Sequence, residues 1–177
     1  MGLEADETCV VAGIAARLNP VKDIATLIRG FAKAYRAFPA LRLLIAGDGE
    51  EMANLKQLAA DLGVAKAVCF AGWISDTDSF YNALDINTLT SISETFPYAL
   101  TEGARAGLPT ISSKVGGVSY LIDHGSNGFL FPPGEDQALA DHLLTLARDP
   151  DLRKTMGQRL YEKAKREFSI EATVQRQ

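Results

Sequence analysis

The chain has 177 residues, the length of one domain, and hydrophobic residues make up 47% of it, which excludes a disordered or low-complexity protein. Its 18 basic and 22 acidic residues give a formal charge of −4, so a nucleic-acid partner, which usually meets a basic excess, is not expected. Two cysteines and two histidines are too few for a disulfide framework or a histidine-rich metal site, and we expect neither.

Six short apolar runs predict β-strands. Their apolar residues are continuous rather than alternating, which is typical of strands that are covered on both faces. In chain order the runs are 8–16, 41–47, 67–72, 86–91, 109–113 and 128–131.

Helical patterns separate these runs. Between Pro20 and Pro39, apolar residues recur at the spacing of one helix face, namely Ile24, Leu27, Ile28, Phe31 and Tyr35. Further helices are predicted at 52–62, 77–84, 98–107, 118–123, 136–148 and 150–167.

The repeated alternation of strand and helix predicts an α/β fold, a three-layer, doubly wound, Rossmann-like domain with a parallel sheet of about six strands. We expect residues 1–177 to form this single domain. Right-handed crossovers place every strand-to-helix loop at one edge of the sheet. In the common strand order 3-2-1-4-5-6, the loop 15–22 lies beside the loop 92–97, where such folds bind ligands.

The loop after the fourth strand carries two carboxylates. We expect Glu94 just ahead of the helix at 98–107 and Glu102 about one turn inside it. Two carboxylates would repel a bound phosphate, but they suit hydrogen bonds from the hydroxyls of a ribose and a sugar ring. The alternative is that both residues only complement the helix dipole.

The start of this helix is a predicted anion site. Pro97 has no N–H and suits a first helical turn, and the positive helix end would face the ligand. The amides expected to be free are those of Tyr98, Ala99 and Leu100.

Two cations follow the first strand. Arg17 and Lys22 could hold two phosphates from one side, Arg17 as a planar fork of donors and Lys22 as a point charge. The alternative is that both are solvated, with Asn19 or Asp23 capping the next helix.

Glycine-rich turns mark the same edge. Gly47-Asp48-Gly49 lacks the third glycine of a dinucleotide motif and is interpreted as a tight turn with Asp48 as a cap. Gly116-Gly117 would let a ligand approach closely or form a plain turn. Trp73, after Gly72, would border a base or be a partly buried core aromatic.

These motifs follow one another in an order that resembles a known family. They are Arg17-Leu-x-x-x-Lys22, Ala46-Gly-Asp-Gly49, Phe70-Ala-Gly-Trp73, Ser93-Glu94-x7-Glu102 with Gly107-Leu-Pro109, Val115-Gly-Gly117 and Asn127-Gly-Phe-Leu-x-Pro-Pro-Gly134. Together they resemble the carboxy-terminal domain of GT-B glycosyltransferases of the retaining group called family 4. The resemblance covers about residues 8–168.

The resemblance implies the donor-binding half of a two-domain enzyme that transfers sugar with retention of configuration. Its donor would be a UDP-, GDP- or ADP-sugar, and the N-terminal acceptor domain would be missing from this chain. Neither a metal nor a cofactor is implied, and the expected products are polysaccharides or glycolipids. The alternative is a stand-alone module that binds a nucleotide or sugar phosphate without catalysis.

The resemblance also implies roles for residues. Glu94 would hold the transferred sugar as the catalytic residue, and Glu102 would accept from the ribose. Trp73 remains the candidate for contact with the base because of its place at this edge, and the resemblance does not assign it that role. The diphosphate would contact Arg17, Lys22 and the backbone of Phe96, Pro97, Tyr98, Ala99 and Leu100.

No apolar run reaches the roughly 20 residues of a membrane span, so the expected location is the cytoplasm, with peripheral attachment at the inner membrane through the missing domain.

The sequence departs from the family pattern at four places. Asp23 follows Lys22 where glycine is frequent, Thr95 replaces a common glycine, and Gly103 replaces an alanine after Glu102. Ser119-Tyr120 stands where a Pro-Glu pair is usual. These changes bear on the identity of the donor's sugar more than on the fold or the phosphate site.

Overall fold

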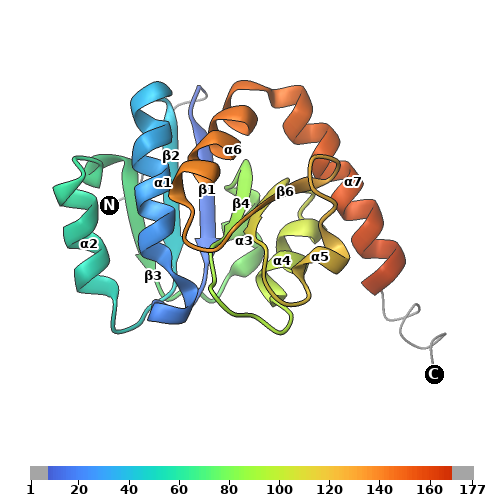
Figure 1. Ribbon diagram of the computed structural model, residues 1–177, viewed down its shortest axis with the longest axis horizontal. Coiled ribbons are helices and arrows are strands. Elements are labelled where there is room, and N and C mark those ends of the chain that lie inside the picture. Colours follow the sequence, from blue (N-terminus) through green and yellow to red (C-terminus); the bar gives the residue numbers. More distant parts are fainter. Residues whose placement is uncertain (1–7, 169–177) are drawn as a thin grey trace.

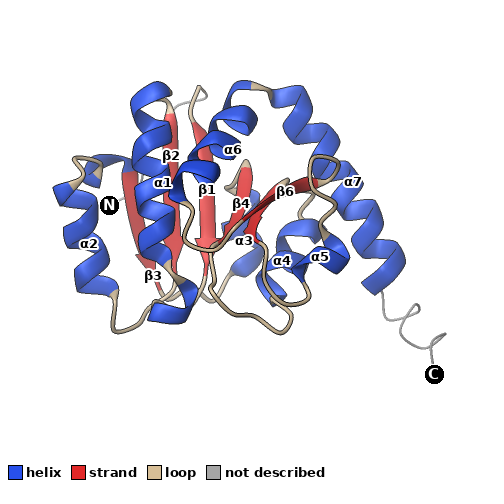
Figure 2. Ribbon diagram, viewed as in Figure 1, coloured by secondary structure: helices blue, strands red, loops and turns tan. Residues whose placement is uncertain are grey.

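Six strands form one parallel sheet in the computed structural model, which describes residues 8–168 (Figures 1 and 2). They are β1 (Val10–Ala15), β2 (Leu41–Ala46), β3 (Val68–Gly72), β4 (Ile86–Leu89), β5 (Thr110–Ser113) and β6 (Gly128–Phe131). The order in the sheet is β3-β2-β1-β4-β5-β6, with every neighbouring pair parallel. The predicted strands and their order are confirmed, with boundaries that differ by at most two residues.

Seven α-helices accompany the sheet in the described part of the chain. They are α1 (Ile24–Ala37), α2 (Met52–Asp61), α3 (Thr77–Asn82), α4 (Tyr98–Arg105), α5 (Val118–Leu121), α6 (Asp136–Arg148) and α7 (Pro150–Phe168). Short 3₁₀ turns at Pro20–Lys22 and Ala65–Ala67 were not expected, since three residues carry no periodic pattern.

The largest core lies between the sheet and α1, α2 and α6. The predicted apolar face of α1 is buried there. Its residues Leu27, Ile28 and Phe31 are fully buried in the same core cluster as Leu43 of β2. Burying one such side chain contributes roughly 1.5–3 kcal/mol. In Figure 1, α1 and α6 lie in front of the strands. Two smaller cores lie under α3 and between α4, α5 and α7.

The carboxyl ends of β1 and β4 are joined by hydrogen bonds between their loops. The amide of Ile92 donates to the carbonyl of Val21 at 2.9 Å, and the Thr90 hydroxyl donates to the carbonyl of Lys22 at 2.8 Å. The predicted juxtaposition of 15–22 and 92–97 is therefore confirmed.

Candidate functional site

A cavity of about 300 Å³ opens at this edge of the sheet. It is lined by the ends of β1 and β4, their loops and the first turns of α4. Of the residues singled out in the sequence, it contains Arg17, Lys22, Glu94, Phe96, Pro97, Tyr98, Ala99 and Glu102. Both cations and both carboxylates thus share one cavity, although the sequence separates them by up to 85 positions (102 minus 17).

Lys22 forms an ion pair with Glu94. Its ammonium contacts Oε1 of Glu94, and its own backbone amide donates to the Asn19 side chain at 3.2 Å. The next residue, Asp23, has φ 45° and ψ 49°, the left-handed conformation that glycine adopts most easily. Asp23 also caps α1, because its carboxylate accepts from the amide and hydroxyl of Thr26. The departure at position 23 therefore keeps the glycine conformation and adds a cap.

Glu94 is held by groups that the sequence did not point to. The Ser91 hydroxyl donates to Oε1 of Glu94 at 2.8 Å, and the Ser113 hydroxyl donates to the Ser91 carbonyl at 2.6 Å. Gly116 has φ 48°, and a Cβ there would lie 1.7 Å from the Glu94 carbonyl oxygen. The double glycine therefore lets two loops pack closely around Glu94.

Arg17 extends from a loop that a second turn fixes in place. The amide of Leu18 donates to the carbonyl of Asp48 at 2.9 Å. A Cβ at Gly47 would lie 1.8 Å from the Ala16 carbonyl oxygen, so only glycine fits. This agrees with the interpretation of Gly47-Asp48-Gly49 as a tight turn. The Arg17 side chain is exposed and forms no ion pair within residues 8–168.

The first turn of α4 offers fewer amides than expected. The amide of Leu100 already donates to the Pro97 carbonyl at 3.1 Å, and its side chain is fully buried, so the expectation of a free Leu100 amide was wrong. A 3₁₀-type bond closes this first turn. The amides of Tyr98 and Ala99 have no backbone partner among the described residues and remain for an anion at the positive helix end.

Glu102 is bound by Tyr81, a residue that sequence reasoning missed. The Tyr81 hydroxyl on α3 donates to Oε2 of Glu102 at 3.0 Å. Burial, and then the charge of Glu102, raise the pKa of Tyr81 well above its ordinary value, so the phenol stays protonated. The two residues are 21 positions apart with a strand between them, and no sequence motif links residues at that spacing.

Gly103, the residue after Glu102, lies too close to a neighbouring strand for a larger residue to fit. A Cβ at Gly103 would lie 2.3 Å from the amide nitrogen of Asn87, which is fully buried on β4. Asn87 donates from this nitrogen to the Ala99 carbonyl at 3.2 Å. Glycine in place of alanine at position 103 therefore leaves room for the polar side chain of Asn87 under α4.

Trp73 lies outside this cavity and borders a second one. It is 82% exposed, which rules out the core-aromatic alternative. The second cavity, of about 650 Å³, also contains Asp48, Ile74 and Thr77. Both cavities include Ala15, Ala16 and Arg17, so Arg17 lies where they meet.

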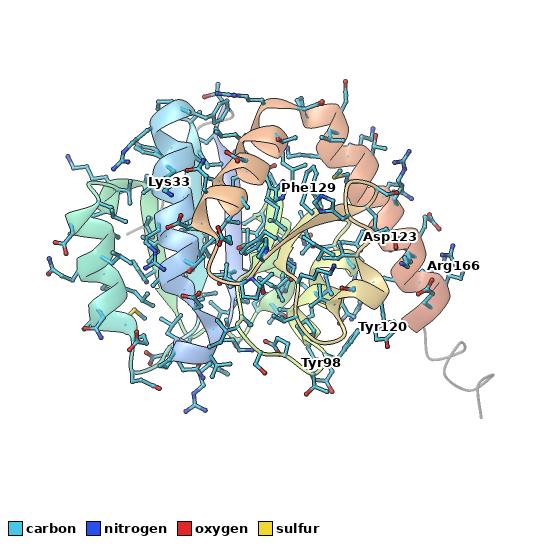
Figure 3. All side chains as sticks on the ribbon, viewed as in Figure 1. Lys33, Tyr98, Tyr120, Asp123, Phe129 and Arg166 are labelled. Carbon is cyan, nitrogen blue, oxygen red and sulfur yellow. The ribbon has the colours of Figure 1, made fainter. Side chains whose placement is uncertain are left out.

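Two exposed tyrosines lie at the rim. Tyr98 is 81% exposed at the start of α4, and Tyr120, one of the two residues in place of the usual Pro-Glu pair, is 75% exposed on α5. Figure 3 shows both side chains at the outer surface, in the lower part of the view.

Within residues 8–168, no three metal-binding side chains cluster, and none of the helices there has the length and apolar character of a membrane span.

Comparison with known proteins gives matches along nearly the whole chain. The family described as glycosyl transferases group 1 matches residues 3–163. The N-acetyl-alpha-D-glucosaminyl L-malate synthase of Bacillus anthracis is 31% identical over 159 residues, which are 90% of this chain and 42% of that protein. The lipopolysaccharide core biosynthesis glycosyltransferase LpsE of Rhizobium meliloti is 34% identical over 151 residues, 85% of this chain and 43% of LpsE.

Among solved structures, HepE of Anabaena in complex with UDP superposes with a TM-score of 0.89 and 30% identity. The match covers 96% of this chain and 47% of the HepE chain. HepE has also been solved with UDP-glucose. The chain therefore spans less than half the length of these relatives.

Proposed function

The chain belongs to the glycosyl transferases group 1 family, in which it corresponds to the C-terminal domain, and from this premise we propose that it forms the donor-binding half of a retaining glycosyltransferase. Its substrate would be a sugar attached to UDP, GDP or ADP. A second domain of the full-length enzyme would hold the acceptor. The observation that carries the proposal is the cavity in which Arg17, Lys22, Glu94 and Glu102 converge.

The diphosphate would lie between the two cations and the start of α4. Arg17 offers a fork of donors and Lys22 a compact charge, while the amides of Tyr98 and Ala99 add donors at the helix end. Both cations would neutralise the charge that grows on the diphosphate as its bond to the anomeric carbon breaks. The solved complex of HepE with UDP supports a nucleoside diphosphate as the ligand of this fold.

The carboxylates would hold the hydroxyls on either side of the diphosphate. Glu94 would accept from the transferred sugar and Glu102 from the ribose, because carboxylates accept hydrogen bonds and repel phosphate. Trp73 would border the base in the neighbouring cavity, which Arg17 links to the first. The acceptor hydroxyl would attack the anomeric carbon from the face that the diphosphate leaves, as the resemblance to retaining enzymes implies, and its proton would pass to the departing diphosphate.

Calorimetry with UDP, GDP and ADP tests the proposal on the 177-residue chain. We expect one of them to bind, and Arg17→Ala or Lys22→Ala to weaken its binding by about ten- to a hundredfold, since a hydrogen bond to a charged group contributes roughly 1.5–3 kcal/mol. Plain nucleosides should bind the variants as they bind the wild type.

Lys66→Ala is the matched control, because Lys66 is exposed in the turn before β3, at the opposite edge of the sheet. An equal loss of affinity in Lys66→Ala would show a general charge effect and contradict the proposed site. Failure of all three diphosphates to bind at millimolar concentration would overturn the donor-binding assignment.

The isolated chain is expected to bind the donor without transferring sugar. Transfer needs a cleft from which water is excluded, and in two-domain enzymes both halves build that cleft. The alternative of a binding module is tested with the full-length gene product. Sugar transfer by that protein, lost in Glu94→Ala, would exclude the module.

A further inference from the structure

Tyr81 has a hydroxyl whose position is fixed by its ring. The side chain is 3% exposed and lies in a small core with Phe80, Leu84 and Leu108. Phe80 meets the ring edge-on, with 5.1 Å between the ring centroids. A ring packed in this way has little rotational freedom, so its hydroxyl is a stationary donor.

The Tyr81 hydroxyl donates to Glu102, a longer side chain that is less constrained by packing. Glu102 has three side-chain torsions and is only half-buried on α4, so burial alone does not fix its carboxylate. Arg105 follows three residues later on the same helix and lines, with Glu102 and Tyr81, a polar cavity of about 250 Å³. Residues at this spacing are neighbours on a helix surface, so Arg105 is a competing partner for the carboxylate.

The structure has the carboxylate bound to Tyr81 rather than to Arg105. Oε2 of Glu102 accepts from the Tyr81 hydroxyl at 3.0 Å, and Glu102 takes part in no ion pair within residues 8–168. The raised pKa of Tyr81 keeps the phenol protonated, so it remains a donor at neutral pH. Oε1 is left for a ligand in the cavity that Glu102 shares with Arg17 and Lys22.

We infer that Tyr81 is a positioning residue for ribose recognition: it orients the Glu102 carboxylate and so enables the site to distinguish a ribonucleotide from a nucleotide that lacks the ribose hydroxyls. The inference rests on the proposed function, because it takes Glu102 as the acceptor for ribose hydroxyls. Tyr81 itself would touch neither the ribose nor the reacting atoms. Removing its hydroxyl should therefore affect only ligands that carry ribose hydroxyls.

The test compares UDP with 2′,3′-dideoxy-UDP by calorimetry on the wild-type chain and on Tyr81→Phe. If GDP or ADP is the preferred diphosphate, the corresponding pair of that base replaces them. We expect Tyr81→Phe to lower the affinity for UDP by roughly ten- to a hundredfold, the range for a hydrogen bond to a charged group, and to leave the dideoxy ligand unchanged. The ratio of the two affinities is the readout, because partial unfolding would lower both affinities equally and cancel.

Two further variants separate positioning from a structural effect. Tyr35→Phe removes a hydroxyl from a half-buried tyrosine stacked on Phe31 in α1, and it should leave the ratio unchanged. In a Glu102→Ala background, Tyr81→Phe should cause no further loss, since a positioning residue acts through the residue that it positions.

Each outcome decides one claim. A wild-type chain that binds UDP, together with a Tyr81→Phe variant that has the wild-type affinity ratio, would overturn the role of Tyr81 and leave donor binding intact. A further loss in the Glu102→Ala background would also overturn it. A wild-type chain that binds none of the nucleoside diphosphates would overturn the proposed function itself.

Discussion

At the scale of single residues, the charges in the cavity balance one another. Lys22 and Glu94 form an ion pair, and Ser91 holds the same carboxylate oxygen. A diphosphate that binds Lys22 must therefore lie beside a carboxylate. This arrangement is favourable only if Glu94 gains hydrogen bonds from a sugar, because like charges at close range repel.

Glu94→Gln tests this balance. Removing the carboxylate charge should raise the affinity for a plain nucleoside diphosphate by roughly fivefold, about 1 kcal/mol, because repulsion disappears and Lys22 is released. The affinity that a sugar adds to the diphosphate should fall. Calorimetry with UDP and UDP-sugars measures both changes.

Asp61→Asn, the same charge change at the end of α2, serves as the control. Equal tightening in this control, or weaker binding of the diphosphate to Glu94→Gln, would show that Glu94 does not face the diphosphate.

At the scale of elements, α4 is placed by its contact with β4. Gly103 approaches the buried Asn87, whose amide nitrogen also donates to Thr110 at 3.3 Å. The second polar atom of Asn87, Oδ1, is buried without a hydrogen-bond partner among the described residues, and such an atom costs about 1–3 kcal/mol. The close packing of α4 on β4, which sets the position of Glu102, therefore depends on a glycine opposite a buried polar side chain, where the usual alanine would not fit.

Gly103→Ala should destabilise the chain by about 1–3 kcal/mol, because a Cβ at 2.3 Å from Asn87 forces a shift that outweighs the higher helix propensity of alanine. The loss should disappear, or reverse, in a chain that also carries Asn87→Ala. Urea unfolding measures all four members of this cycle. Additive effects of the two changes would mean that position 103 and Asn87 are not coupled.

At the scale of the whole molecule, we expect a histidine outside the cavity lining to make stability depend on pH. His142 on α6 is stacked on Phe129 of β6, with 4.5 Å between ring centroids, and His124 lies 5.5 Å away. Burial, and then the charge of His124, lower the pKa of His142 below its ordinary 6.5, while Leu130 and Asp141 act in the opposite direction. The unfolded chain therefore binds more protons than the folded chain as the pH falls through 6.5.

The free energy of unfolding should consequently decrease between pH 7.5 and pH 5, with no contribution from this group at higher pH. Urea unfolding across this range is the measurement, and His142→Gln should reduce the slope. Asp76, whose pKa is lowered from 3.8 by its hydrogen bonds to Ser79, affects stability only at more acidic pH and does not interfere. A slope that is unchanged in His142→Gln would contradict this role.

The fold and the meeting point of the loops could be predicted from the sequence alone. Continuous apolar runs, helical spacing and glycines are local signals, and the chirality of the crossovers then brings the ends of β1 and β4 together. Arg17, Lys22, Glu94 and Glu102 could be placed at one edge for that reason, since each follows a strand or opens a helix.

Only the tertiary structure decided which of these groups contact each other. Lys22 reaches Glu94 across 72 residues, and Tyr81 reaches Glu102 across 21. The Leu100 amide is already occupied, and Trp73 borders a different cavity. Such contacts depend on side-chain packing between separate elements, for which a single chain has no repeating pattern, whereas the layered fold follows from periodicities that every short segment carries by itself.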